Sequence, residues 1–227
     1  MRSNTVLVGL VDSGCRPDQR SRVAQALAFD WDGKEVQVAP ATDDSLGHGS
    51  TQLEVMAWLA PQAHFAVAQV FQHRLATRAV QVAAAVDWLV ATGADVINLS
   101  LGLSTDRAVL AEACQRAVAA GVVVCAASPA RGAPVYPAAY PGVLRATGDA
   151  RCQREDISYL GTRHADFGGH ARPLHGGLNG AGASVGCAHI SALLARYLTA
   201  GGAPEARAWE HWLKREARYH GPERRTD

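Results

Sequence analysis

Short, uninterrupted apolar runs alternate with helix-type segments through the first half of the chain. The apolar runs fall at residues 5–11, 64–71, 95–102 and 122–127, and apolar residues recur every three or four positions in 79–93 and 106–120. A short apolar run bounded by turns is typical of a strand buried on both faces. Strands that alternate with helices form parallel sheets through right-handed crossovers. The sequence therefore predicts an α/β fold, with a mostly parallel central sheet flanked by helices.

The regular alternation ends after residue 127. Residues 128–178 are rich in proline and glycine, with short strand-like runs at 143–146 and 157–159. Loops this long in a compact domain are often functional. We expect one main domain over residues 1–203. Residues 204–227 are expected to form a polar helix, as far as residue 219, and a basic tail that packs on this domain or extends from it.

Charge and cysteine content exclude several classes of partner. The 227 residues carry a formal net charge of +1, which gives no sign of a nucleic-acid or membrane-surface partner. No apolar run reaches the roughly 20 residues that a membrane span needs, and we expect no signal peptide. The five cysteines are odd in number and form no C-x-x-C pair. Reduced thiols in a cytoplasmic protein are therefore expected.

A glycine-rich stretch at residues 179–183 leads into one serine, Ser184, and an apolar segment with helical spacing follows. A helix should begin at or near Ser184. A serine at that position can simply cap the helix with its side-chain oxygen. It can also be a nucleophile, because a helix start offers free N–H groups and a positive dipole end to an anion. This stretch alone leaves both interpretations open.

Two other residues could act together with that serine. Asp12 follows the first apolar run, at the sheet edge where ligands bind in open α/β folds. His48 opens a predicted helix directly after Gly47. Separately, Asp12 could be a turn residue and His48 a surface histidine. Together they match a serine nucleophile, a histidine that takes its proton, and a carboxylate that fixes the histidine tautomer.

In these three residues and their surroundings, the chain resembles the subtilisin-like serine peptidases. Val8-Gly9-Leu10-Val11-Asp12-Ser13-Gly14 resembles their Asp motif, and Gly47-His48-Gly49-Ser50 resembles their His motif. Gly182-Ala183-Ser184-Val185 resembles their Ser motif, and all three motifs stand in the family's chain order. The resemblance covers roughly residues 5–200. It implies a three-layer subtilisin-like sandwich with Asp12, His48 and Ser184 as the catalytic triad.

The same resemblance implies how substrate binds. Asp95-Val96-Ile97-Asn98-Leu99-Ser100-Leu101-Gly102 matches the family's strand and glycine exit beside the substrate cleft. Ser100, Leu101 and Gly102 would then pair with an extended peptide through main-chain hydrogen bonds. This chemistry requires no metal and no organic cofactor.

One departure from the family concerns the oxyanion. Members usually place Gly-Asn after the fourth strand, and the asparagine amide helps to stabilise the oxyanion. Here Pro129-Ala130 follows Ser128, so that amide is missing. The Ser184 backbone N–H is expected to remain as one donor, with Ser128 or Asn179 as open choices for a second. Ala183 and Ala188 also replace the usual threonine and proline.

These features predict a specialised serine endopeptidase. A cytoplasmic peptidase without an inhibitory prodomain must avoid general proteolysis, and narrow specificity is one solution. The chain is similar to small cytoplasmic subtilisin-like enzymes that trim leader peptides, including those of quinohemoprotein amine dehydrogenase maturation. The expected partner is a peptide or protein substrate, such as a leader-bearing precursor. The alternative is a pseudopeptidase that binds a peptide without cutting it.

Two further clusters allow more than one interpretation. Asp43 and Asp44 precede His48 and either form a solvated loop or line the cleft, where they would favour basic substrates. Loop histidines 164, 170 and 175 lie near Cys152 in sequence, but their spacing fits no standard zinc motif. Cys187, three residues after Ser184, is expected to be a buried small apolar residue rather than a second nucleophile.

Overall fold

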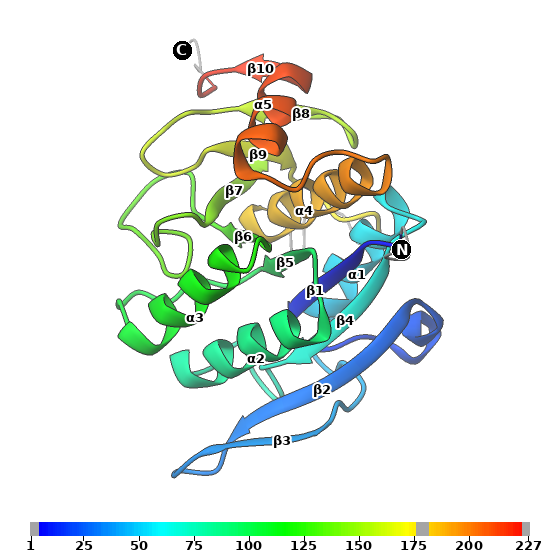
Figure 1. Cartoon of the computed structure of the whole chain (residues 1–227), viewed down its shortest axis with the longest axis vertical. Helices are drawn as coiled ribbons and strands as arrows, with labels where there is room; N and C mark the ends of the chain where they lie inside the picture. The colour runs from blue at the N-terminus through cyan, green and yellow to red at the C-terminus, as the bar shows by residue number, and fades with distance from the viewer. Residues whose placement is uncertain (1–4, 176–181, 224–227) are drawn as a thin grey trace.

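The computed structural model describes residues 5–175 and 182–223. Within these ranges, ten strands form one sheet in the order β10-β8-β9-β7-β6-β5-β1-β4-β2-β3 (Figure 1). The strands are β1 (Leu7–Asp12), β2 (Val23–Trp31), β3 (Val36–Pro40), β4 (His64–Gln69), β5 (Val96–Leu99), β6 (Val123–Ala127), β7 (Leu144–Asp149), β8 (Ile157–Tyr159), β9 (Phe167–His170) and β10 (Ala217–His220). Only the β2–β3 and β8–β9 neighbours are antiparallel in this sheet of the described chain.

The helices lie on both faces of the sheet. They are the short 3₁₀ helix η1 (Pro17–Arg22), α1 (His48–Leu59), α2 (Ala79–Thr92), α3 (Ala108–Ala119), α4 (Ala183–Thr199) and α5 (Ala206–Glu216). The longest is α4, with 17 residues. No helix within residues 5–175 and 182–223 is both long enough and apolar enough to cross a membrane.

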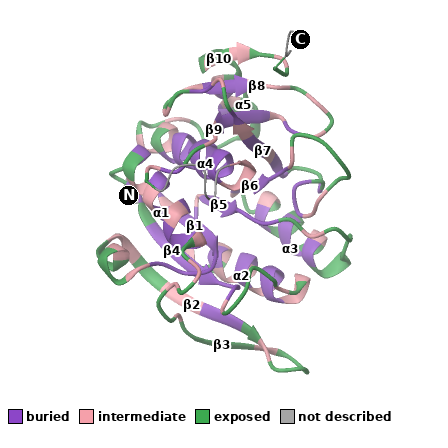
Figure 2. Ribbon diagram, turned by 180° about the vertical axis from the view of Figure 1, so that it is seen from behind, coloured by how far each residue is buried: buried purple, intermediate pink, exposed green. Residues whose placement is uncertain are grey.

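Two apolar cores separate these layers. On one face, Leu53 of α1, Leu193 of α4 and Trp209 of α5 pack in a single buried cluster with strand residues such as Phe65. On the other face, α2 and α3 bury a second cluster against Ile97 and its neighbours. Figure 2 shows the buried central strands and the exposed β3 at one end of the sheet. The predicted three-layer α/β sandwich with a mostly parallel sheet is confirmed.

The predicted strands hold where both faces of a strand are buried. The four apolar runs become β1, β4, β5 and β6. The β2–β3 hairpin was not predicted. Most residues of β3 are exposed, so its sequence carries no apolar run that would indicate a buried strand. The predicted end of the C-terminal helix, at residue 219, is wrong. The helix stops at Glu216, and residues 217–220 form β10, which pairs in parallel with β8.

The sheet order places the first two site residues at one edge. β1 lies between β4 and β5, with Val11 opposite Leu99 and Asp12 opposite Gln69. Because the carboxyl ends of parallel strands meet at the same edge, Asp12 and Ser100 come close together there. The first residues of α1 and α4, two helices that pack in the same core, line a cleft together with Ser100.

Candidate active site

Asp12, the last residue of β1, is completely buried. Its Oδ1 accepts hydrogen bonds from the Ser13 backbone N–H at 2.7 Å and from His48 Nδ1 at 2.7 Å. Its Oδ2 is buried without a hydrogen-bond partner among the described residues. Burial raises the pKa of the Asp12 carboxyl above its usual value, and the hydrogen bonds from His48 and Ser13 oppose that rise.

His48 is the first residue of α1, and 18% of its side chain is exposed. The carboxylate of Asp12 holds the Nδ1 proton, so the unprotonated nitrogen of the neutral ring is Nε2. Burial by itself would lower the pKa of His48. The hydrogen bond and charge of Asp12, and the charge of Asp44, outweigh that effect and raise this pKa above its usual value. In its neutral form the ring is therefore oriented with Nε2 free to accept a proton, as a general base requires.

The loop before α1 fixes the position of this histidine. Asp44 accepts hydrogen bonds from the backbone N–H of Ser50 at 2.9 Å, from its hydroxyl at 2.6 Å, and from the Gly47 N–H at 2.8 Å. Gly49 packs so closely on the Gly14 carbonyl that a Cβ atom would overlap it. The glycine lets the start of α1 lie directly against the segment that follows Asp12.

Ser184 is the second residue of α4 and is half-buried. N–H groups in the first turn of a helix lack an intrahelical acceptor, which leaves the Ser184 N–H available to a ligand. Gly186 allows the helix start to press on the sheet, because a Cβ atom there would overlap the Thr147 carbonyl of β7. The Ser184 hydroxyl donates to the Ser100 carbonyl at 3.3 Å. Within the described ranges, no hydrogen bond joins it to His48.

A buried polar chain connects β5 to the start of α4. The Ser191 hydroxyl donates to Asn98 Oδ1 at 3.0 Å, and the Asn98 amide donates to the Ser100 hydroxyl at 2.8 Å. That hydroxyl donates in turn to the Ser184 carbonyl at 3.2 Å. Asn98 and Ser191 are completely buried. The chain therefore sets the distance between the Ser100 segment and Ser184.

His48 and Ser184 line the same cleft, which has a volume of about 610 Å³. Ser100, Leu101 and Gly102 lie along it, as the sequence predicts for a substrate-binding segment. Sequence reasoning missed several apolar residues of its walls, namely Phe71, Leu75, Leu103 and Val135. Leu75, which is 58% exposed, sits in an irregular segment where no periodicity could mark it.

The oxyanion donors are the least complete part of the site. Pro129 lines the cleft, as do Ala127 and Ala183, and no asparagine or glutamine does so within residues 5–175 and 182–223. Ser128 is 5% exposed, and its hydroxyl donates to the His164 carbonyl at 2.6 Å. Its backbone N–H donates to the Ala146 carbonyl. The other candidate, Asn179, lies outside the described residues.

The remaining sequence candidates have other surroundings. Asp44 binds the start of α1 and Asp43 pairs with Arg20 at 2.7 Å, so neither belongs to the described lining of the cleft. No group of three or more metal-binding side chains occurs within the described residues. Cys187 is completely buried, as predicted, and burial and the neighbouring Cys125 raise the pKa of its thiol well above the usual value.

Comparison with known proteins agrees with this geometry. The profile of the subtilase family, peptidase S8, matches residues 3–226. The minor extracellular protease Epr of Bacillus subtilis is 25% identical over 156 residues, which cover 63% of this chain and 23% of that protein. A thermostable alkaline protease of Halalkalibacterium halodurans is 27% identical over 170 residues, which cover 70% of this chain and 45% of that one.

Two solved structures share the fold. S41 psychrophilic protease superposes with a TM-score of 0.65 at 20% identity, over 88% of this chain and 79% of that one. A lanthipeptide protease superposes with a TM-score of 0.64 at 21% identity, over 91% and 78%. The chain spans less than half the length of the two bacterial proteases that it matches in sequence. The family profile covers nearly all of the chain, which therefore belongs to the subtilase family.

Proposed function

We propose that this protein is a serine endopeptidase of subtilisin type with narrow specificity, which removes a leader or another defined segment from a peptide or protein precursor. The observation that carries this proposal is the 2.7 Å contact between His48 Nδ1 and Asp12, beside a cleft that also holds Ser184 and the Ser100–Gly102 segment. Membership of the subtilase family supports the same chemistry.

In this mechanism the Ser184 oxygen attacks the scissile carbonyl while His48 Nε2 takes the hydroxyl proton. The Asp12 carboxylate holds the ring and stabilises the imidazolium that forms. His48 then gives its proton to the leaving amine, and water attacks the acyl-enzyme in the reverse sequence. The Ser184 hydroxyl must leave the Ser100 carbonyl and turn to His48. Catalytic hydrogen bonds are often long in free enzymes and tighten when substrate binds.

Backbone pairing along Ser100–Gly102 would give affinity for any extended peptide, so specificity must come from the cleft walls. Leu75, Leu103 and Val135 offer apolar surface there. One neighbour of the same fold is a protease named for lanthipeptides, and this supports a precursor as the class of substrate.

We also propose that the enzyme acts in the reducing cytoplasm. All five cysteines are buried and free, and the sulfur atoms of Cys125 and Cys187 lie 3.6 Å apart without a disulfide. Reduced thiols are the usual state of cytoplasmic proteins.

A fluorophosphonate probe tests the nucleophile. The wild-type protein should be labelled, Ser184→Ala should not, and His48→Ala should react far more slowly. Ser45→Ala is the matched control, because its hydroxyl donates to the Gln72 carbonyl outside the cleft and labelling should be unchanged. An unlabelled but folded wild-type protein would contradict the proposal.

The second candidate function is a peptide-binding pseudopeptidase. It is favoured by the Ser184 hydroxyl bonded to Ser100 and by the lack of a side-chain amide in the described cleft. Incubation with candidate leader peptides encoded near this gene, followed by mass spectrometry, separates the two functions. One defined cut supports the processing enzyme, whereas binding with no cut supports the pseudopeptidase.

A further inference from the structure

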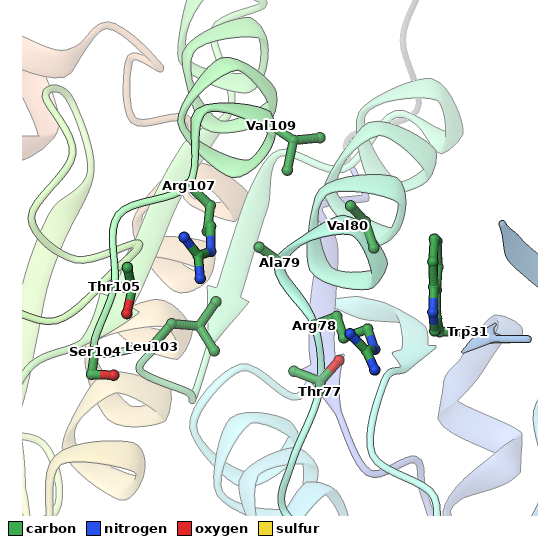
Figure 3. A pocket seen from close by; sticks show the side chains of 10 residues that line it. All are labelled: Trp31, Thr77, Arg78, Ala79, Val80, Leu103, Ser104, Thr105, Arg107 and Val109. Carbon is green, nitrogen blue, oxygen red and sulfur yellow. The ribbon is translucent and has the colours of Figure 1, made fainter. Parts of the chain in front are cut away.

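A second pocket of about 420 Å³ lies between the starts of α2 and α3 (Figure 3). We call it the distal pocket, and its lining includes Trp31, Thr77, Arg78, Ser104 and Arg107. Arg78 and Arg107 are the residues immediately before α2 and α3. In Figure 3, the guanidinium of Arg107 points into the space between the two helix starts, and Arg78 lies between Thr77 and Trp31.

The distal pocket is continuous with the cleft that holds Ser184. Thr77, Leu103 and Ser104 line both of them. Leu103 and Ser104 directly follow the Ser100–Gly102 segment, so a peptide paired along that segment is led towards the distal pocket. The two pockets therefore form one path along the surface.

The distal pocket is positively charged. Two of its described lining residues are arginines and none is acidic. Two acids are close in sequence. Asp30 lines an adjoining pocket with Arg78 and accepts from the Trp31 backbone N–H, and Asp106 accepts from the Tyr140 hydroxyl. Neither Arg78 nor Arg107 forms an ion pair within residues 5–175 and 182–223.

The Trp31 ring contacts the Arg78 guanidinium and leaves its positive charge unpaired. The Arg78 guanidinium carbon lies 5.8 Å from the centre of the Trp31 ring. Contact of this kind orients a guanidinium through the ring electrons and leaves its N–H groups available for a carboxylate. The Thr77 hydroxyl on the same wall is a buried donor with no hydrogen-bond partner among the described residues.

We propose that the distal pocket binds an acidic side chain of the substrate, with Arg78 and Arg107 as specificity-determining residues. This inference rests on the proposed peptidase function and names a feature of its substrate. The leaving amine must face His48, so the acyl half of the peptide lies along Ser100–Gly102 and continues to Ser104. Paired strands advance together at about 3.3 Å per residue, which places the acidic residue about four to six positions before the scissile bond.

Cleavage of a proteome-derived peptide library, read by mass spectrometry, tests this preference. Peptides cut by the wild-type protein should be enriched in Asp and Glu four to six positions before the cut. The enrichment should fall about threefold in Arg78→Gln or Arg107→Gln and about tenfold in the double variant, as for exposed ion pairs. The double charge reversal, Arg78→Glu with Arg107→Glu, should select Lys and Arg there instead. Salt should weaken both preferences.

The matched control is Arg207→Gln, an exposed arginine at the start of α5, which should keep the wild-type preference. Cuts without acidic enrichment, or enrichment that survives in the double variant, would overturn the proposal and leave the peptidase function standing.

Binding provides a second test that does not need catalysis. A fluorescein-labelled dodecapeptide with three consecutive Glu residues is titrated into Ser184→Ala protein, and its Gln analogue serves as the comparison. Anisotropy should show tighter binding of the Glu peptide, and adding Arg78→Gln and Arg107→Gln should remove the difference. Equal binding of both peptides would overturn the proposal that the distal pocket binds an acidic side chain. A Glu preference of the Ser184→Ala protein, together with no cleavage of the peptide library by the wild-type protein, supports the pocket and contradicts the peptidase.

Discussion

The Nδ1 atom of His48 and the Oδ1 atom of Asp12 lie 2.7 Å apart, although 36 positions separate the two residues in the chain. The contact joins the end of a central strand to the first residue of a helix on one face of the sheet. Because the carboxylate is fully buried, water does not screen it, and its interaction with the ring is stronger than at a surface.

Replacing Asp12 by Asn should preserve the shape of the site and remove most of its activity. An amide can no longer stabilise the imidazolium and can hold the ring in the wrong tautomer. We expect kcat to fall by about 10⁴-fold, the size of effect known for this change in a serine peptidase. Peptide hydrolysis measures the loss. Asp149→Asn, which alters a buried aspartate paired with Arg151, is the control, and circular dichroism checks folding of both variants. A loss below tenfold would contradict the role of Asp12.

As the pH is lowered, activity should be lost at a higher pH than a histidine with an ordinary pKa would give. Only neutral His48 can accept the Ser184 proton, and the pKa of His48 is raised, so acid inactivation begins above about pH 6.5. Asp44→Asn removes one negative charge that raises this pKa. Its acidic limb should therefore move to lower pH in a profile of kcat/KM.

Asp43→Asn is the matched control for this shift. Asp43 is adjacent in sequence and pairs with the exposed Arg20, and its charge is not among the causes of the raised His48 pKa. The profile of this variant should coincide with that of the wild type. Equal shifts in both variants would show a general charge effect instead.

Ser128→Ala should affect stability more than catalysis. The Ser128 hydroxyl donates to the His164 carbonyl, so its loss should cost about 1 kcal/mol of unfolding free energy in urea. If Ser128 were instead the second oxyanion donor, kcat would fall by about 10²–10³-fold, the size of effect known for loss of such a donor in a subtilisin. Parallel measurements of kcat and urea unfolding decide between these roles.

Asn98→Ala should affect both quantities. The change removes the acceptor of the buried Ser191 hydroxyl and the amide that donates to the Ser100 hydroxyl, and should cost about 1–3 kcal/mol of unfolding free energy. Because the Ser100 hydroxyl donates to the Ser184 carbonyl, the start of α4 should also shift and kcat should fall. Urea unfolding and single-turnover hydrolysis test this. Loss of stability with unchanged kcat would show that Asn98 does not position Ser184.

The central sheet and the candidate triad could be predicted from the amino-acid sequence. Runs such as Val96–Leu99 are apolar because both faces of the strand are buried, and this requirement is visible in a few consecutive residues. Asp12, His48 and Ser184 each stand at the boundary of an element, where turn and capping residues mark the position locally. Their order along the chain then indicated the family before any contact was known.

The contacts of these side chains could not be predicted from the sequence and depend on the three-dimensional packing. The Ser128 hydroxyl donates to the His164 carbonyl, and Asp44 accepts from the start of α1. Residues 217–220 continue a helical sequence pattern but pair with β8 as strand β10. The same packing brings Trp31, Arg78 and Arg107 to one pocket from three separate elements. The direction of a side chain depends on how distant elements pack against each other, and no local pattern in the sequence encodes that packing.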